Sequence, residues 1–248
     1  MSRAITIAPK AMIRQKVDRD GLIVRILLMA FIGLFLVVLI VPLYMLMSKS
    51  FRDDTGLFIG FGNYYEYFTT PALFQSIENS FFVSGISAAI VTIVAFIYAY
   101  ALTRSRMPFK GFFKVVAFIP LLSPSVVKAI ALVYWFGNQG VLKEALFGHS
   151  IYGPIGIIMG SVFWTFPHVL LIISTALALS DSRLYETAQA LKTGRLRTFL
   201  TVTLPGARYG LISAVFVAFI LVLTDFGVPK IIGGNYNVLA TDIYKEVV

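Results

Sequence analysis

Two charged residues lie in apolar surroundings, and their types suit solute binding better than catalysis. Lys128 lies within a predicted apolar span, and Asp225 ends another apolar run just before a glycine and a proline. A buried ammonium must face protein or water, and a carboxylate at a broken helix can face an aqueous path. We therefore expect Lys128 and Asp225 to line a substrate path. Alternatively, Asp225 caps a helix or snorkels, and Lys128 pairs with Asp225 or Glu144 or extends to the interface.

A polar, basic segment, residues 181–208, contains the second set of candidate residues. Its first half reads Asp-Ser-Arg-Leu-Tyr-Glu-Thr-Ala-Gln-Ala-Leu-Lys-Thr-Gly from Asp181, which predicts a capped amphipathic helix ended by a glycine. A second short helix is predicted to stop at Pro205. Small side chains let a helix lie deep in a groove of another protein, and a glycine permits a left-handed turn. The segment is thus suited to docking, through Glu186, Ala188, Gly194, Phe199, Val202, Leu204 and Pro205.

The sequence contains no recognisable catalytic set. It has no Gly-Lys-Ser/Thr phosphate loop, no Ser/His/Asp arrangement and no cysteine. His168 has no second histidine or carboxylate at ligand spacing, so we expect neither a metal nor a cofactor. The sequence therefore predicts that the chain is not an enzyme and does not itself bind ATP.

The elements that position these residues are predicted to be membrane helices. Hydrophobic residues make up 58% of the chain and occur in long blocks, which indicates an all-α membrane protein. A bilayer is crossed by roughly 20 residues, and five runs approach or exceed that length. The first run is too long for a removable signal peptide. The predicted spans are residues 22–47, 81–102, 115–136, 151–179 and 211–228.

Basic residues orient these spans. Six lie in the N-terminal tail and its flank, four between the second and third spans, and five between the fourth and fifth, whereas the alternate connections carry five in all. The positive-inside rule then places the N-terminus and the loop containing Glu186 in the cytosol. The net charge of +9 is explained by these flanks, which suit an anionic lipid surface, so we expect membrane lipid and no nucleic acid as a partner.

The 181–208 segment resembles the coupling loop of permeases of binding-protein-dependent ATP-binding-cassette (ABC) importers. That family carries Glu-Ala-Ala, a Gly, then Phe and Leu-Pro at fixed distances, and here Thr187 replaces an Ala, Lys192 stands at the usual Gly position and Gly194 follows two residues later. The resemblance implies a type I ABC importer transmembrane domain of about five spans. It divides the chain into a basic cytosolic tail (1–21) and a permease domain (22–248) with the coupling loop at 181–208. The matching residues are Glu186, Ala188, Leu191, Phe199, Val202, Leu204 and Pro205.

The resemblance also implies partners and a mechanism. A separate ATP-binding cassette subunit would dock on the loop, a periplasmic solute-binding protein would deliver solute, and a second permease bundle would complete an alternating-access path. The chain ends where another helix could begin, so we expect a sixth span, or a whole second half, to be missing. The competing class is an ion-coupled secondary transporter, which needs carboxylates in several spans. A membrane-embedded enzyme would need a reactive cluster, and none is visible.

The segment from Thr224 to Tyr244 looks like the permease subgroup that handles 2-aminoethylphosphonate, which is related to ferric-iron and polyamine permeases. The resemblance implies transport of a small polar solute, with 2-aminoethylphosphonate as the first expectation. A phosphonate would suit the ammonium of Lys128. Ferric iron, a polyamine or another small solute are the alternatives.

Overall fold

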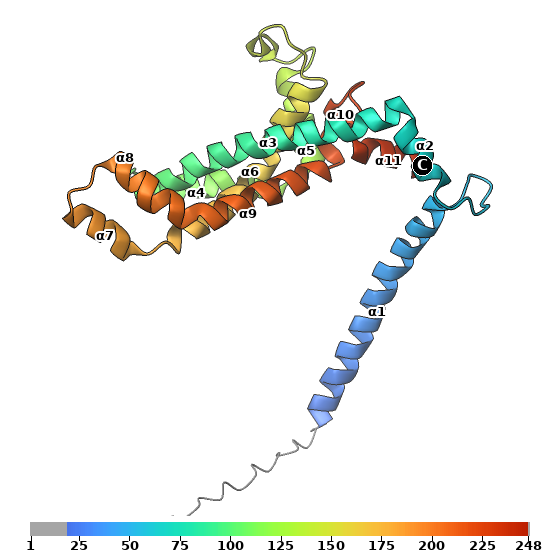
Figure 1. The fold of residues 1–248 in the computed structure, drawn as a ribbon, viewed down its shortest axis with the longest axis horizontal. Helices are drawn as coiled ribbons and strands as arrows, with labels where there is room; N and C mark the ends of the chain where they lie inside the picture. Colours follow the sequence, from blue (N-terminus) through green and yellow to red (C-terminus); the bar gives the residue numbers. More distant parts are fainter. Residues whose placement is uncertain (1–18, 248) are drawn as a thin grey trace, which may run out of the picture. The chain divides into compact units, whose positions relative to one another are not determined.

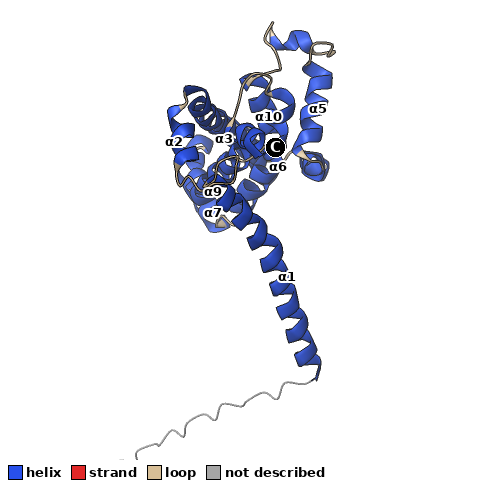
Figure 2. Ribbon diagram, turned by 90° about the vertical axis from the view of Figure 1, so that its right-hand side faces the viewer, coloured by secondary structure: helices blue, strands red, loops and turns tan. Residues whose placement is uncertain are grey.

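The computed structural model describes residues 19–247, so the predicted basic tail 1–21 lies almost entirely outside the described residues. Within that range the chain is helical and forms no strand beyond one isolated bridge between Arg52 and Phe58 (Figures 1 and 2). The described residues divide into two compact units, 19–67 and 68–247. The elements are α1 (Arg19–Ser50), α2 (Gly62–Thr69), α3 (Pro71–Arg104), α4 (Lys110–Phe118), η1 (Ile119–Leu122), α5 (Ser125–Phe136), η2 (Lys143–Leu146), α6 (Pro154–Ala178), α7 (Ser182–Ala190), α8 (Arg195–Thr198), η3 (Phe199–Thr203), α9 (Leu204–Leu223), α10 (Gly227–Ile232) and α11 (Leu239–Val247).

The first unit consists of α1, the compact loop that follows it and most of α2. α1 has 32 residues and none of them is buried, as befits an apolar helix that meets lipid. At about 1.5 Å per residue it exceeds the roughly 30 Å of a hydrocarbon core. The ring of the loop residue Phe51 contacts Phe61 and also Tyr64 of α2, and the Asn63 side chain of α2 donates to the Ser50 carbonyl at 3.0 Å. The loop is a small ordered cap on the helix end.

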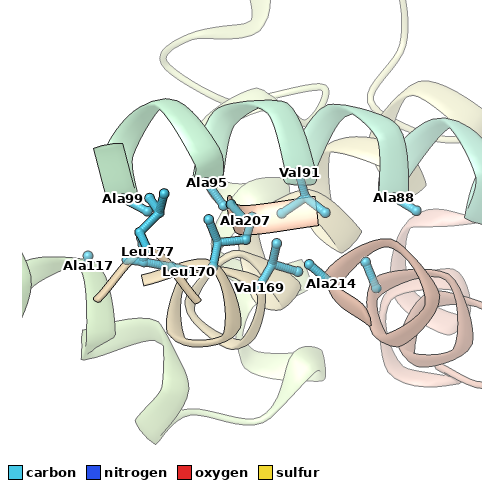
Figure 3. Close-up of a cluster of buried hydrophobic side chains, with 12 residues drawn as sticks. Ala88, Val91, Ala95, Ala99, Ala117, Val169, Leu170, Leu177, Ala207 and Ala214 are labelled. Carbon is cyan, nitrogen blue, oxygen red and sulfur yellow. The ribbon is translucent and has the colours of Figure 1, made fainter. Parts of the chain in front are cut away.

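The core of the second unit is formed by α3, α6 and α9, which pack along one another. Alanines at positions 88, 95 and 99 of α3 face Val169 and Leu170 of α6 and Ala214 of α9 (Figure 3). Small side chains let helix backbones approach closely, which is the usual basis of helix association in membranes. At Gly210 of α9 the helices are so close that even an alanine side chain would not fit, because a Cβ there would lie 2.2 Å from the Cβ of Ala176 on α6.

The predicted third span, residues 115–136, is not one straight helix. α4 with η1 and the following α5 are bent by 105° at a short break. Pro120 and Pro124 explain the break, since proline lacks an N–H and disfavours helical backbone in the residue before it. Ser123, which precedes Pro124, is extended with φ −118° and ψ 146°. In the described residues, four helices are long and apolar enough to cross a membrane, or five if the bent pair counts as one span.

The predicted fifth span also ends earlier than expected. α9 stops at Leu223, and α10 begins at Gly227 after a three-residue break that contains Asp225. Val228 and Ile232 of α10 are buried in a second apolar cluster with Ala129 and Ile157. The expectation of a broken helix around Asp225 is confirmed.

Candidate functional site

The first half of the 181–208 segment folds into α7. The Asp181 carboxylate accepts a hydrogen bond from the Arg183 N–H at 2.9 Å, so the predicted N-terminal cap is present. Glu186 is exposed, whereas Ala188 is buried against the chain itself. Of the two, Glu186 alone remains available to a partner.

The turn after α7 is made by Lys192 and not by Gly194, contrary to the sequence prediction. The Lys192 N–H donates to the Gln189 carbonyl and the Thr193 N–H donates to the Ala188 carbonyl, both at 2.9 Å. This bond pair is a Schellman motif, which requires a left-handed residue at the position of Lys192. Lys192 indeed has φ 50°, while Gly194 is extended with φ −61° and ψ 151° and precedes α8.

Pro205 does not end the second helix, as the sequence had predicted, but lies inside a continuous helix from Arg195 to Leu223. The π-turn η3 explains how the helix tolerates it. The Leu204 N–H donates to the Phe199 carbonyl, five residues back. A widened turn relieves the clash that a proline ring makes with the preceding turn of a regular helix. Leu204 and Pro205 remain exposed at the start of α9.

Phe199 points into its own chain. Its ring packs edge-on against Phe96 at 5.9 Å and against Tyr100 at 5.7 Å, both on α3. The sequence predicts Phe199 as part of an apolar docking contact, but in the structure its ring packs against α3 instead.

Three exposed leucines give the α7–α8 part of the segment its apolar surface, and of these the sequence analysis named only Leu191, as a residue that matches the family pattern. Leu184, Leu191 and Leu196 are between 51% and 74% exposed, although they are surrounded by basic residues. A soluble loop rarely gathers large apolar side chains on its surface unless a partner covers them. The sequence predicted that these leucines lie on helices, but it did not show which face of each helix is exposed.

Tyr185 is the second feature that the sequence analysis missed. Its ring lies under the guanidinium of Arg104, with 4.0 Å between the guanidinium carbon and the ring centroid. Its hydroxyl donates to Oγ1 of Thr203 at 3.1 Å. Tyr185 thereby connects α7 to the end of α3 and to the π-turn before α9.

Lys128 lies in the first turn of α5 and is only 4% exposed. Its Nζ donates to the Ser123 carbonyl at 2.6 Å and lies 5.8 Å from the centroid of the Trp164 ring. An ammonium has three N–H donors, and the Ser123 carbonyl satisfies one of them.

Asp225 caps α10, which was one of the two alternatives for this residue. Its carboxylate accepts from the Val228 N–H at 3.0 Å, the Gly227 N–H at 3.3 Å and the Ser125 hydroxyl at 2.8 Å. The bond from Ser125 ties the break before α10 to the first turn of α5, where Lys128 lies. Lys128 and Asp225 form no ion pair in the described part of the chain. The two charges therefore lie on neighbouring elements without neutralising each other directly.

A cavity of about 480 Å³ lies at the other end of α6 from the 181–208 segment. It is lined by neutral groups, including Tyr152, Gly153 and the loop from Gly233 to Tyr236. Burial raises the pKa of the Tyr236 hydroxyl above its ordinary value, so this ring stays neutral.

These features define a multi-pass membrane protein with an ordered polar loop between two of its long helices. The sequence model of the family described as binding-protein-dependent transport system inner membrane component matches residues 93–245, and the chain belongs to that family. The matched region contains Lys128, Asp225 and the whole 181–208 segment.

Several curated relatives are transport system permease proteins. The putative ferric transport system permease protein FbpB 1 of Haemophilus influenzae is 29% identical over 185 residues, which cover 71% of this chain and 29% of that protein. The molybdenum transport system permease protein ModB of Azotobacter vinelandii is 29% identical, covering 66% of this chain and 76% of that protein. The chain thus spans less than a third of the ferric permeases that it matches.

The fold is shared with a solved transporter. The crystal structure of a bacterial ABC transporter involved in the import of the acidic polysaccharide alginate superposes with a TM-score of 0.70, covering 93% of this chain and 85% of that chain at 19% identity. The expected importer-type transmembrane fold is therefore confirmed.

Proposed function

We propose that this chain is the permease of an ATP-driven importer and that α7 and α8 form the docking site for a separate ATP-binding cassette subunit. The observation that carries the proposal is that one short segment exposes the apolar side chains of Leu184, Leu191 and Leu196 together with the carboxylate of Glu186. An apolar centre with a charged rim is the usual composition of a protein interface. Glu186 would supply the charged contact, and Gly194, Leu204 and Pro205 would border the site.

The proposed mechanism is alternating access. Closure of the ATPase on ATP moves α7, and this movement rocks the helix bundle from inward to outward facing. A periplasmic solute-binding protein delivers solute to the opposite face, and a second permease bundle completes the path. The excess of basic residues in the tail, in residues 104–114 and in the 181–208 segment supports a cytosolic N-terminus and a cytosolic docking site.

The proposed solute is small and polar, with 2-aminoethylphosphonate as the first candidate. It carries one anionic and one cationic end, which the ammonium of Lys128 and the carboxylate of Asp225 would complement. A polyamine or a ferric ion would be repelled by a buried ammonium. Sulfate or molybdate, which relatives are named for, would suit Lys128 but would leave Asp225 without a role in binding.

The docking proposal is tested by co-purification of the permease with its ATPase and by ATP-driven uptake. Glu186→Ala should lose both at equal membrane abundance, because an interface charge is removed. Glu144→Ala, an exposed carboxylate on η2, is the matched control and should retain both. Equal co-purification and uptake in the two variants would exclude docking through Glu186.

The solute proposal is tested separately by uptake of labelled 2-aminoethylphosphonate in competition with sulfate, molybdate, ferric iron and spermidine. Lys128→Met should abolish uptake while the ATPase remains bound, and Lys143→Met on η2 should leave uptake unchanged. Efficient uptake of a polyamine or of iron, with no uptake of the phosphonate, would overturn the assignment and leave the docking proposal in place.

A further inference from the structure

The 181–208 segment, which we also call the docking segment, is joined to the helix bundle by a cluster of three side chains. We call these side chains the Arg104 cluster. It consists of Arg104, the last residue of α3, Tyr185 of α7 and Thr203, the last residue of η3. The Arg104 guanidinium stacks over the Tyr185 ring at 4.0 Å, and the Tyr185 hydroxyl donates to Thr203 at 3.1 Å. Thr203 is 1% exposed, so the hydrogen bond from Tyr185 reaches the interior of the bundle.

Arg104 extends the cluster to a third long helix. Its Nη2 donates to the Leu177 carbonyl at 2.7 Å. Leu177 is in the last turn of α6, where helix carbonyls have no partner within the helix and a cation is favoured. The cluster therefore touches the ends of α3 and α6 and the start of α9, the three helices that form the core of the second unit.

From this geometry we propose that Tyr185 is the positioning residue through which movement of α7 reaches α3, α6 and α9. The proposal rests on the proposed function, since it presumes that an ATPase moves α7. Leu184 and Glu186, on either side of Tyr185 in the sequence, are exposed, whereas the Tyr185 side chain contacts Arg104 and Thr203 of the bundle. One short helix thus presents adjacent residues to the partner and to the bundle.

Tyrosine suits this position because it makes two contacts at once. Its ring face binds a guanidinium by cation–π interaction, and its hydroxyl makes a directional hydrogen bond. Phenylalanine retains the first contact and loses the second, and leucine loses both. In the same way, lysine at position 104 keeps the charge but loses the planar stack and the fork of donors.

The test is the number of solute molecules transported per ATP hydrolysed, measured with the permease, its ATPase and its binding protein reconstituted in proteoliposomes. Tyr185→Leu should lower this ratio about fivefold and Tyr185→Phe about twofold, while the amount of bound ATPase stays unchanged. A purely structural residue would lower abundance or total activity and leave the ratio intact. Arg104→Lys should lower the ratio to a similar extent as Tyr185→Leu.

Arg208 and Tyr209 provide the matched control. This pair also stacks, at 4.5 Å, but it joins neighbours within α9 and its tyrosine is exposed. Tyr209→Leu should leave the ratio unchanged.

A double-mutant cycle separates the effect of the Tyr185–Thr203 hydrogen bond from a general loss of folding. Thr203→Val is nearly isosteric and removes the acceptor of the Tyr185 hydroxyl, so Tyr185→Phe combined with Thr203→Val should be no worse than either change alone. Additive losses, or an unchanged ratio in Tyr185→Leu with the ATPase still bound, would overturn the proposal. A wild-type permease that binds no ATPase would instead refute the proposed function, and with it the premise of a moving α7.

Discussion

The substitution Lys192→Gly should stabilise the end of α7. Lys192 has φ 50° and closes the helix with two hydrogen bonds, so it pays the steric cost of a left-handed residue with a side chain. That cost is roughly 1–2 kcal/mol. Glycine avoids this cost, but its greater conformational entropy stabilises the unfolded chain by about 0.4–1 kcal/mol. At the midpoints of these two ranges the difference favours glycine by about 0.8 kcal/mol.

The assay is hydrogen exchange of the Thr193 amide, which donates to the Ala188 carbonyl and is present in both proteins. After correction for intrinsic rates, exchange in Lys192→Gly should be roughly two- to fivefold slower. Gly194→Ala is the control, because Gly194 has an extended backbone and a Cβ there would meet nothing within 4 Å. We expect no loss of protection in that control.

The reverse result would refute the reasoning. If Gly194→Ala accelerated exchange of the Thr193 amide and Lys192→Gly did not slow it, the left-handed turn would lie at Gly194, where the sequence pattern had placed it.

Two further changes follow from contacts described above, and a third prediction concerns a carboxylate in the loop after α1. Asp225→Ala should lower the free energy of unfolding by about 1–2 kcal/mol, because two backbone N–H groups and a hydroxyl lose their acceptor, and an unchanged thermal midpoint in detergent would contradict the cap. Gly210→Ala should cost about 1–3 kcal/mol by forcing α9 away from α6, whereas Gly85→Ala on α3, with nothing within 4 Å of the new Cβ, should cost nothing in the same melt. Hydrogen bonds to the carboxylate of Asp53, above all from the Thr55 hydroxyl, hold the pKa of Asp53 below its ordinary value of 3.8. Its loop is therefore stabilised above about pH 4, and this stabilisation disappears as pH falls through the lowered pKa, so a carboxyl-carbon NMR titration with a midpoint at or above 3.8 would disprove it.

The parts of the fold that the sequence predicted are those set by local chemistry. The cap at Asp181 needed only a carboxylate two residues before an N–H. The break near Pro124, inside the predicted span 115–136, has an equally local cause in the missing N–H of proline. The size of the bend was not predictable, because the 105° angle depends on where α5 finds α10 and α6 to pack against.

The errors in the docking segment share one cause. Gly194 was assigned the turn and Pro205 the helix end because of their intrinsic preferences, but tertiary contacts fixed both positions. Burial of Ala188 sets where α7 ends, so the left-handed position falls on Lys192. Packing of Phe199 against α3 holds η3 in place, so the helix continues through Pro205. The stacking of Arg104 on Tyr185 joins distant parts of the chain, and no local pattern encodes it.

The π-turn at Phe199–Thr203 acts as a single-residue insertion in an otherwise regular helix. Each residue of an α-helix turns the chain by about 100°, so one extra residue rotates everything before it by about that angle relative to α9. The direction in which α7 and α8 face around the bundle is therefore set by the number of residues between Arg195 and Pro205. Deleting one residue from this turn would leave the apolar faces of α9 where they are and turn the surface of Leu184, Leu191 and Leu196 toward a different side of the molecule.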